Sequence, residues 1–275
     1  MLYSLFPEIY TGSTRYFGLK MKLAAKITVC FLVVCLVLSS CAGRQTLARR
    51  DNLNEFFHKK EVTIAVTDSG LGGLSILAET LEKMKKAKIF SRMNFIFVNS
   101  LFSNEGGYNS LRTQREKVLI LDSALKGIAD NFAPDLILIG CHTLSILYDK
   151  TPFSRQTPIP VAGIVETGVE LIAESLKSHP EAKVILFATP TTIMEGTYKN
   201  RLVEKGFLEE RIIPQACPEL AQYIEQDHAG DETEMLIFAY ADEALQKTNG
   251  VDFPLYISFN CTHYGYSLDC WRKVF

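Results

Sequence analysis

The chain has 275 residues, of which 47% are apolar, and a formal net charge of −2 at pH 7. A chain of this length and composition can bury a substantial core, which argues against an intrinsically disordered protein. The balanced charge provides no broad electrostatic attraction to nucleic acid or to an anionic membrane surface. Any association with a membrane must therefore come from a particular segment.

Such a segment lies near the N-terminus. Two lysines precede an apolar run, residues 27–38, that is shorter than a membrane-spanning helix needs to be, and small residues follow it. The run ends in Leu38-Ser39-Ser40-Cys41, which resembles a bacterial lipobox and implies a diacylated Cys41. We therefore predict a signal region over residues 1–41 and an exported protein, lipid-anchored to a bacterial membrane at the periplasmic face or the cell surface. An uncleaved anchor, or a mistranslated leader on a soluble protein, is the alternative.

The rest of the chain is predicted to form a tether and two lobes. Residues 42–60 are polar and charged, as expected of a tether, and the folded body is expected to begin at Glu61. From there, short β-branched runs alternate with longer amphipathic segments, which predicts an α/β fold with parallel sheets covered by helices. A polar stretch with two prolines divides the body into two doubly wound lobes, residues 61–152 and 153–275, with the active site in the cleft between them. The predicted strands are residues 62–67, 94–98, 136–139, 159–162, 183–187 and 255–259.

The first predicted strand ends in a glycine-rich turn, Asp68-Ser69-Gly70-Leu71-Gly72-Gly73. Its glycines permit a tight turn and leave the amides of the following helix open to an anion. Asp68 and Ser69 could equally be caps of that helix. A dinucleotide-binding fingerprint would need a glycine where Ser75 stands, so no such cofactor is predicted.

Two cysteines stand at the carboxyl ends of predicted strands. Cys141 and Cys261 each have a threonine and a histidine within two residues. A lone buried cysteine is usually a small hydrophobic residue, but a matched pair in two lobes suggests acid–base chemistry. Inverting the α-carbon of an amino acid without a cofactor requires removal of the proton from one face and its return on the other, so two bases must face each other. The resting enzyme would hold one thiol and one thiolate.

Six motifs follow one another along the chain: Asp68-Ser-Gly-Leu-Gly-Gly-Leu74, Cys141-His-Thr143, Val165-Glu166, Ala188-Thr-Pro-Thr-Thr192, Ala216-Cys-Pro218 and Cys261-Thr-His-Tyr264. In this order they resemble the motifs of glutamate racemases, in the aspartate/glutamate racemase family. The resemblance implies cofactor-independent racemisation of glutamate by proton transfer between two cysteines. It further implies a small amino-acid substrate, no cofactor and no metal, and it allows a homodimer.

The resemblance also assigns roles to residues. Cys141 would be the base for the α-proton of the D-enantiomer and Cys261 the base for the L-enantiomer. Asp68 would assist the first thiol and His263 the second, with Glu166 adjusting the charge nearby. Glu166 could equally be a first-turn acid favoured by a helix dipole. The substrate contacts implied are Asp68, Ser69, His142, Thr143, Thr189, Thr191, Thr192, Thr262 and His263.

The sequence departs from the family pattern in four places, of which Gly265 in place of a usual proline is the least important. His142 replaces a usual asparagine, and a charged imidazole there would alter the acidity of the first thiol. After the second strand, Asn99-Ser100 and residues 106–109 replace the family signature, and Tyr108 is not assigned to the substrate. Relatives also continue beyond the second cysteine motif and return to the first lobe. That return is missing here and would leave an open edge in the first lobe, so either the sequence is truncated or the first lobe closes differently.

Other functions remain open at this stage. The substrate could be aspartate or another amino acid. Cys141, His142, Cys261 and His263 could bind a metal, although consecutive Cys-His is poor spacing for a closed tetrahedral site. A non-catalytic amino-acid-binding lipoprotein is the third possibility, because export would separate the protein from the cytoplasmic pool of amino acids. In an oxidising compartment the two facing thiols could also join as a disulfide.

Overall fold

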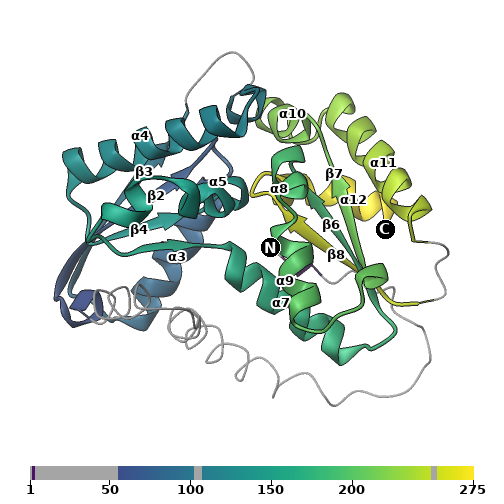
Figure 1. The fold of residues 1–275 in the computed structure, drawn as a ribbon, viewed down its shortest axis with the longest axis horizontal. Coiled ribbons are helices and arrows are strands. Elements are labelled where there is room, and N and C mark those ends of the chain that lie inside the picture. The colour runs from purple at the N-terminus through teal and green to yellow at the C-terminus, as the bar shows by residue number, and fades with distance from the viewer. Residues whose placement is uncertain (1, 4–54, 102–106, 249–252) are drawn as a thin grey trace.

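The computed structural model describes residues 2–3, 55–101, 107–248 and 253–275. Its ribbon shows two lobes side by side, each built around one sheet (Figure 1). Cys41, the predicted signal apart from residues 2–3, and most of the predicted tether lie outside the described residues. Within those residues, no helix combines the length and the apolar character that a membrane crossing requires.

The first lobe contains a parallel sheet with the strand order β3-β2-β4-β5. Its strands are β2 (Glu61–Asp68), β3 (Arg92–Asn99), β4 (Leu136–Ile139) and β5 (Val161–Gly163). Its helices are α3 (Gly73–Ala87), α4 (Gln114–Phe132), α5 (His142–Leu147) and α6 (Phe153–Gln156), with the 3-10 turns η1 (Tyr108–Ser110) and η2 (Tyr148–Lys150). In the described part of the chain, β3 forms one edge of this sheet, and most of its side chains are half-buried.

The second lobe contains a sheet with the strand order β1-β8-β6-β7. The strands β6 (Lys183–Ala188), β7 (Ile212–Ala216) and β8 (Leu255–Asn260) are parallel, and β1 (Leu2–Tyr3) pairs antiparallel with β8. The residues of β1 belong to the segment predicted as a signal region. The helices are α7 (Val165–Ser178), α8 (Pro190–Glu195), α9 (Thr197–Glu204), α10 (Leu220–Gln226), α11 (Asp231–Gln246) and α12 (Leu268–Val274), with the 3-10 turns η3 (Glu209–Arg211) and η4 (Tyr264–Ser267).

Each sheet is covered on both faces, because alternate residues of its strands enter different cores. In β2, Ala65 packs into one cluster with α4 and α5, whereas its neighbours Ile64 and Val66 pack into another. In β6, Phe187 and Leu186 are divided in the same way. The predicted α/β class, with two doubly wound parallel-sheet lobes, is confirmed.

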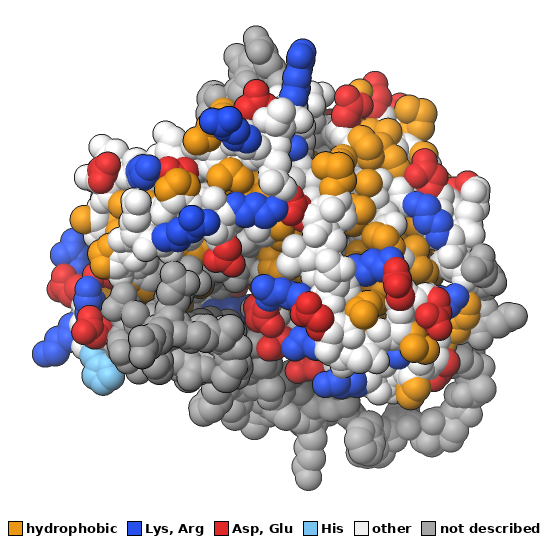
Figure 2. All heavy atoms as spheres, viewed as in Figure 1, with side chains coloured by type: hydrophobic (Ala, Val, Ile, Leu, Met, Phe, Trp, Pro, Cys, Tyr) orange, Lys and Arg blue, Asp and Glu red, His pale blue; other side chains and the backbone are white. Residues whose placement is uncertain are grey.

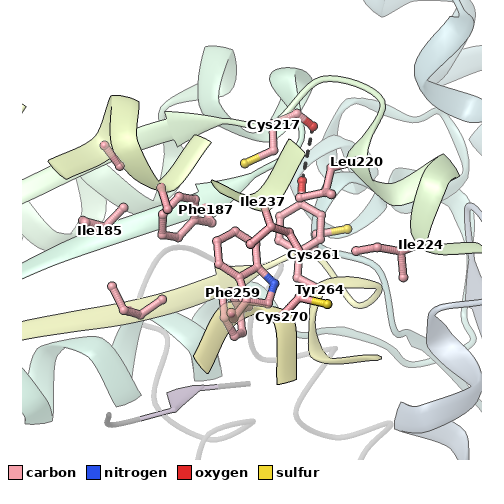
Figure 3. Close-up of a cluster of buried hydrophobic side chains, with 14 of the residues drawn as sticks. Ile185, Phe187, Cys217, Leu220, Ile224, Ile237, Phe259, Cys261, Tyr264 and Cys270 are labelled. Atoms are coloured by element: carbon pink, nitrogen blue, oxygen red, sulfur yellow. Dashed lines mark hydrogen bonds between the residues drawn. The ribbon is translucent and has the colours of Figure 1, made fainter. Parts of the chain in front are cut away.

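The core on one face of the second sheet includes the last helix. Trp271 of α12 is fully buried and packs against Phe187 and Phe259, with ring centroids 4.7 and 4.8 Å away. Cys270 is buried in the same cluster (Figure 3). The residues after the second cysteine motif therefore complete the core of the second lobe.

Two predicted boundaries and one strand differ between the sequence analysis and the structure. Phe56 is only 2% exposed and packs edge-on against Phe90 at 5.1 Å, so the folded body begins before Glu61 and the predicted tether is too long. The predicted boundary after residue 152 precedes β5, which still pairs with β4 in the first sheet. Strand β7 was not predicted, because Pro214 interrupts its apolar run. A proline is tolerated there since β7 lies at the edge of its sheet.

The surface is consistent with the balanced charge. On the face shown in Figure 2, acidic and basic side chains are interspersed over both lobes and no large area of one sign is visible. This distribution gives no sign of a nucleic-acid-binding face in that view.

Candidate active site

Both cysteines that the sequence singles out lie at strand ends facing the boundary between the lobes. Cys141 follows β4 and precedes the first residue of α5, and Cys261 follows β8. They are 5% and 8% exposed and line the same cavity, whose empty volume is about 250 Å³ including the part open to solvent. Its lining residues are Asp68, Ser69, Asn109, Cys141, His142, Thr143, Thr189, Ala221, Cys261, Thr262 and His263. Residues from both lobes therefore build one pocket with a thiol from each.

Cys141 is held among polar groups of the first lobe. Its sulfur lies 3.3 Å from Ser69 Oγ. Burial, followed by the negative charge of Asp68, raises the pKa of the Cys141 thiol far above its usual value, although Ser69 and the Leu144 amide act in the opposite direction. Without a ligand, Cys141 therefore keeps its proton at neutral pH.

Cys261 has a histidine partner. Its sulfur lies 3.6 Å from His263 Nδ1, and His263 Nε2 lies 2.7 Å from Glu225 Oε1. Burial acts to lower the pKa of His263, but its hydrogen bonds with Cys261 and Glu225, together with the negative charges of Cys261 and Asp68, outweigh burial and raise that pKa well above its usual value. The hydrogen bond to His263 in turn lowers the pKa of Glu225. A protonated imidazole therefore stands beside Cys261, where it can stabilise negative charge on the sulfur.

Glu225 was not predicted from the sequence, and Glu166 was predicted in error. Glu225 lies on α10, whose first turn follows the Ala216-Cys-Pro218 motif. Glu166 lies on α7, forms an ion pair with Arg201 and is absent from the cavity lining. It follows the end of β5, but its helix carries the side chain to the surface of the second lobe. The first-turn interpretation of Glu166 describes it better.

Asp68 lines the cavity and connects the two lobes through a hydrogen bond. Its side chain is fully buried and accepts a hydrogen bond of 2.9 Å from Thr262 Oγ1 in the second lobe. Its other oxygen accepts hydrogen bonds from the Gly70 amide at 3.2 Å and from Ser69 Oγ at 3.3 Å. Asp68 is thus fixed beside Cys141 by groups from both lobes.

The glycine-rich turn receives the second lobe rather than an external anion. A Cβ atom on Gly72 would lie 2.4 Å from Thr262 Oγ1 and 2.7 Å from His263 Nδ1, which is closer than such atoms approach. The amide of Leu71 donates to Glu225 Oε1 at 2.5 Å. The anion that this turn was expected to bind is therefore the Glu225 carboxylate of the same chain. The glycines are needed because the histidine of the other lobe packs directly on the backbone.

Three predicted substrate-binding threonines bond to one another. Thr143 Oγ1 lies 2.9 Å from Thr189 Oγ1 and 3.1 Å from Thr192 Oγ1, and the last two are 3.1 Å apart. Thr143 and Thr189 line the cavity, whereas Thr192 is not among its lining residues. Thr191 faces elsewhere: its hydroxyl accepts a 2.6 Å hydrogen bond from Lys117 of α4. Thr191 is therefore a contact between lobes, and its predicted place in the substrate site is wrong.

Two of the residues at which the sequence departs from the family pattern, Tyr108 and His142, have clear positions in the structure. Tyr108 is buried in the core of the first lobe, and its hydroxyl donates to the Lys117 carbonyl, so it does not reach the cavity. Its neighbour Asn109 lines the cavity instead. His142 also lines the cavity, and burial holds its pKa well below the usual value. The concern that His142 would be charged is therefore not supported at neutral pH.

The described residues also bear on the disulfide and the metal site that the sequence left open. Cys141, Cys217, Cys261 and Cys270 are all buried free thiols there. No group of three or more histidine, cysteine or acidic side chains among the described residues is arranged to hold a metal ion. Cys261 also contacts the apolar cluster of the second lobe, which includes Phe259 and Tyr264 (Figure 3). It therefore forms part of the wall between that core and the cavity.

The chain is similar to known glutamate racemases. No protein-family model matches the chain. It is 26% identical over 217 residues to a glutamate racemase of Persephonella marina, covering 78% of this chain and 75% of that protein. It is 28% identical over 210 residues to a glutamate racemase of Clostridium perfringens strain 13, covering 76% and 74%.

Solved structures show the same fold. The glutamate racemase of Campylobacter jejuni matches with a TM-score of 0.62 at 23% identity, over 78% of this chain and 77% of that chain. The glutamate racemase of Francisella tularensis, solved in complex with D-glutamate, matches with a TM-score of 0.60 at 21% identity, over 78% and 73%.

Proposed function

We propose that this chain, which belongs to the aspartate/glutamate racemase family, interconverts L- and D-glutamate by proton transfer through Cys141 and Cys261. The observation that carries the proposal is the single cavity lined by both thiols, one from each lobe. Each thiol has its own polar partners, Ser69 and Asp68 for Cys141 and His263 for Cys261. This arrangement provides a proton donor and acceptor on either side of a small ligand.

The proposed reaction removes one proton from the α-carbon and adds another on the opposite face. With L-glutamate, the thiolate of Cys261 takes the α-proton, and the carbanion accepts a proton from the Cys141 thiol on its opposite face. The raised pKa of Cys141 suits it to enter this cycle protonated. His263, next to Cys261, stabilises the charge on that sulfur before the transfer. The reverse reaction exchanges the roles of the two sulfur atoms.

The bound amino acid would lie between the wall groups of the two lobes. Thr143, Thr189 and Asn109 offer neutral hydroxyl and amide groups to its carboxylates. Glutamate is the proposed substrate because the curated relatives bear the name glutamate racemase. Aspartate, which has the same charged groups on a shorter chain, is the alternative for the same pocket.

Chiral chromatography of the full chain with a panel of L- and D-amino acids, in the presence of a thiol reductant, tests the proposal. We expect glutamate to approach equal amounts of its two enantiomers from either side, because enantiomers have the same free energy in water. Inversion of aspartate alone would change the substrate. A folded protein that inverts no amino acid but is stabilised by glutamate against heat would instead favour the non-catalytic binding alternative.

We also propose that the protein is exported and anchored by a diacylated Cys41. This proposal rests on the basic, apolar and small residues that precede Cys41 in the sequence. Mass spectrometry of the N-terminal peptide from the native host should find Cys41 as the first residue with two acyl chains. An unmodified N-terminus upstream of Cys41 would contradict the proposal.

A further inference from the structure

One hydroxyl group lies between the residues that adjoin the two thiols. His142 follows Cys141, and Asn260 precedes Cys261. The hydroxyl of Tyr198, on α9, is 2.5 Å from His142 Nδ1, and Tyr198 and Asn260 line the same small cavity. All three side chains are buried, with 3%, 5% and 2% exposure for Tyr198, His142 and Asn260. Tyr198 therefore joins α9 of the second lobe to His142 of the first lobe.

The direction of this hydrogen bond follows from the groups available. Among the described residues, His142 Nδ1 is the hydrogen-bond partner of the Tyr198 hydroxyl. Burial raises the pKa of Tyr198, so the phenol keeps its proton. If this proton did not go to His142 Nδ1, it would have no acceptor among the described residues. His142 Nδ1 is then an acceptor, and the proton of the neutral ring sits on Nε2.

Nε2 of His142 has no hydrogen-bond partner among the described residues, and it is not one of their fully enclosed polar atoms. His142 lines the cavity that holds both thiols. The buried ring therefore offers one unused donor to whatever occupies that cavity.

We propose that Tyr198 is a positioning residue that fixes His142 as the neutral Nε2–H tautomer, so that the pocket presents a neutral donor to a substrate carboxylate. The catalytic meaning of this inference rests on the proposed racemase function. A neutral ring binds an anionic ligand without placing a positive charge next to Cys141, where such a charge would favour loss of the thiol proton. Cys141 can therefore remain the protonated partner in the pair.

The fold gives Tyr198 little freedom to move. A Cβ atom on Gly168 would lie 2.8 Å from the Tyr198 oxygen, so the phenol packs directly against the backbone of α7. The ring of Tyr198 also packs against His142 with centroids 5.7 Å apart. Removing the hydroxyl should therefore change the hydrogen bond while leaving the packing in place.

Imidazole ¹⁵N spectra of histidine-labelled full chain test the inference. The chain contains five histidines, and loss of one signal in His142→Gln identifies the His142 resonances. In the wild-type protein we expect the Nε2-protonated tautomer at neutral pH. In Tyr198→Phe we expect a mixture of tautomers, and a rise in KM of about fivefold to tenfold with kcat changed less, as for loss of one buried hydrogen bond.

The chain offers a matched control. Tyr256 and His179 form the same kind of pair, with the hydroxyl 2.6 Å from Nδ1, and neither lines the cavity. Tyr256→Phe should change the signals of His179 and leave the tautomer of His142 and both kinetic constants unaltered.

A wild-type His142 that is protonated on Nδ1 or charged at neutral pH would overturn the inference, and so would an unchanged tautomer in a folded Tyr198→Phe protein. The wild-type spectrum alone decides the matter if that variant does not fold. Because the spectra need no turnover, a protein that racemises nothing would refute the proposed function while the tautomer still tests the role of Tyr198.

Discussion

Replacing Cys141 or Cys261 with serine is expected to lower kcat/KM for racemisation of glutamate by about 10²- to 10⁴-fold. Each substitution leaves the cavity nearly the same size but removes one of its two acid–base groups, because a serine hydroxyl is far less acidic than a thiol. The loss should appear in both reaction directions, since each direction uses one sulfur as base and the other as acid. Initial rates with L- and with D-glutamate measure it.

Cys270 provides the control for this prediction. It is also buried in the second lobe, but it packs in the core around Trp271 and does not line the cavity. Cys270→Ser should keep the wild-type rate in any fraction that folds. Wild-type rates in both Cys141→Ser and Cys261→Ser would refute a mechanism that depends on two thiols.

The second large effect is expected at Glu225. Its carboxylate helps to raise the pKa of His263, so Glu225→Gln should lower that pKa. His263 is protonated below its pKa, and the proposed reaction needs the protonated ring. The fall of kcat/KM at high pH should therefore begin at a lower pH in Glu225→Gln than in the wild type. Above the lowered pKa of His263, kcat/KM of the variant should fall about tenfold for each further unit of pH.

Glu166 is the matched control for Glu225. Both are acidic residues of the second lobe, and the sequence pointed to Glu166 as the catalytic one. In the structure Glu166 pairs with Arg201 outside the cavity. Glu166→Gln should therefore keep the wild-type pH profile of kcat/KM. A shifted profile in Glu166→Gln together with an unshifted one in Glu225→Gln would reverse the assignment.

The strand ends were predictable because their signal is local. Asp68, Cys141 and Cys261 lie at or just after the ends of largely apolar strands, and the carboxyl ends of parallel strands meet at one edge of a sheet. Strand β7 escaped prediction because Pro214 breaks the pattern of a strand and is acceptable only at a sheet edge. Whether a strand lies at an edge depends on the assembled sheet, which one segment does not reveal.

The pairing of side chains across the lobes was not predictable in the same way. Glu225 reaches His263 from a neighbouring helix, and the same carboxylate accepts the Leu71 amide of the other lobe. The glycines of the first turn suggested an anion site, yet their role is to let His263 and Thr262 approach. The neutral state of His142 depends on its burial, and its hydrogen-bond partner Tyr198 is far from it in the sequence. These features arise only when the two lobes are in contact.

The roles of the two thiols are tested most directly by hydrogen exchange at the α-carbon of glutamate in D₂O. Cys141→Ser retains Cys261 and should introduce deuterium into L-glutamate without inverting it, while leaving D-glutamate unlabelled. Cys261→Ser should label D-glutamate alone. Equal labelling of both enantiomers by each variant would show that the two sulfur atoms do not serve opposite faces of the substrate, and would contradict the account.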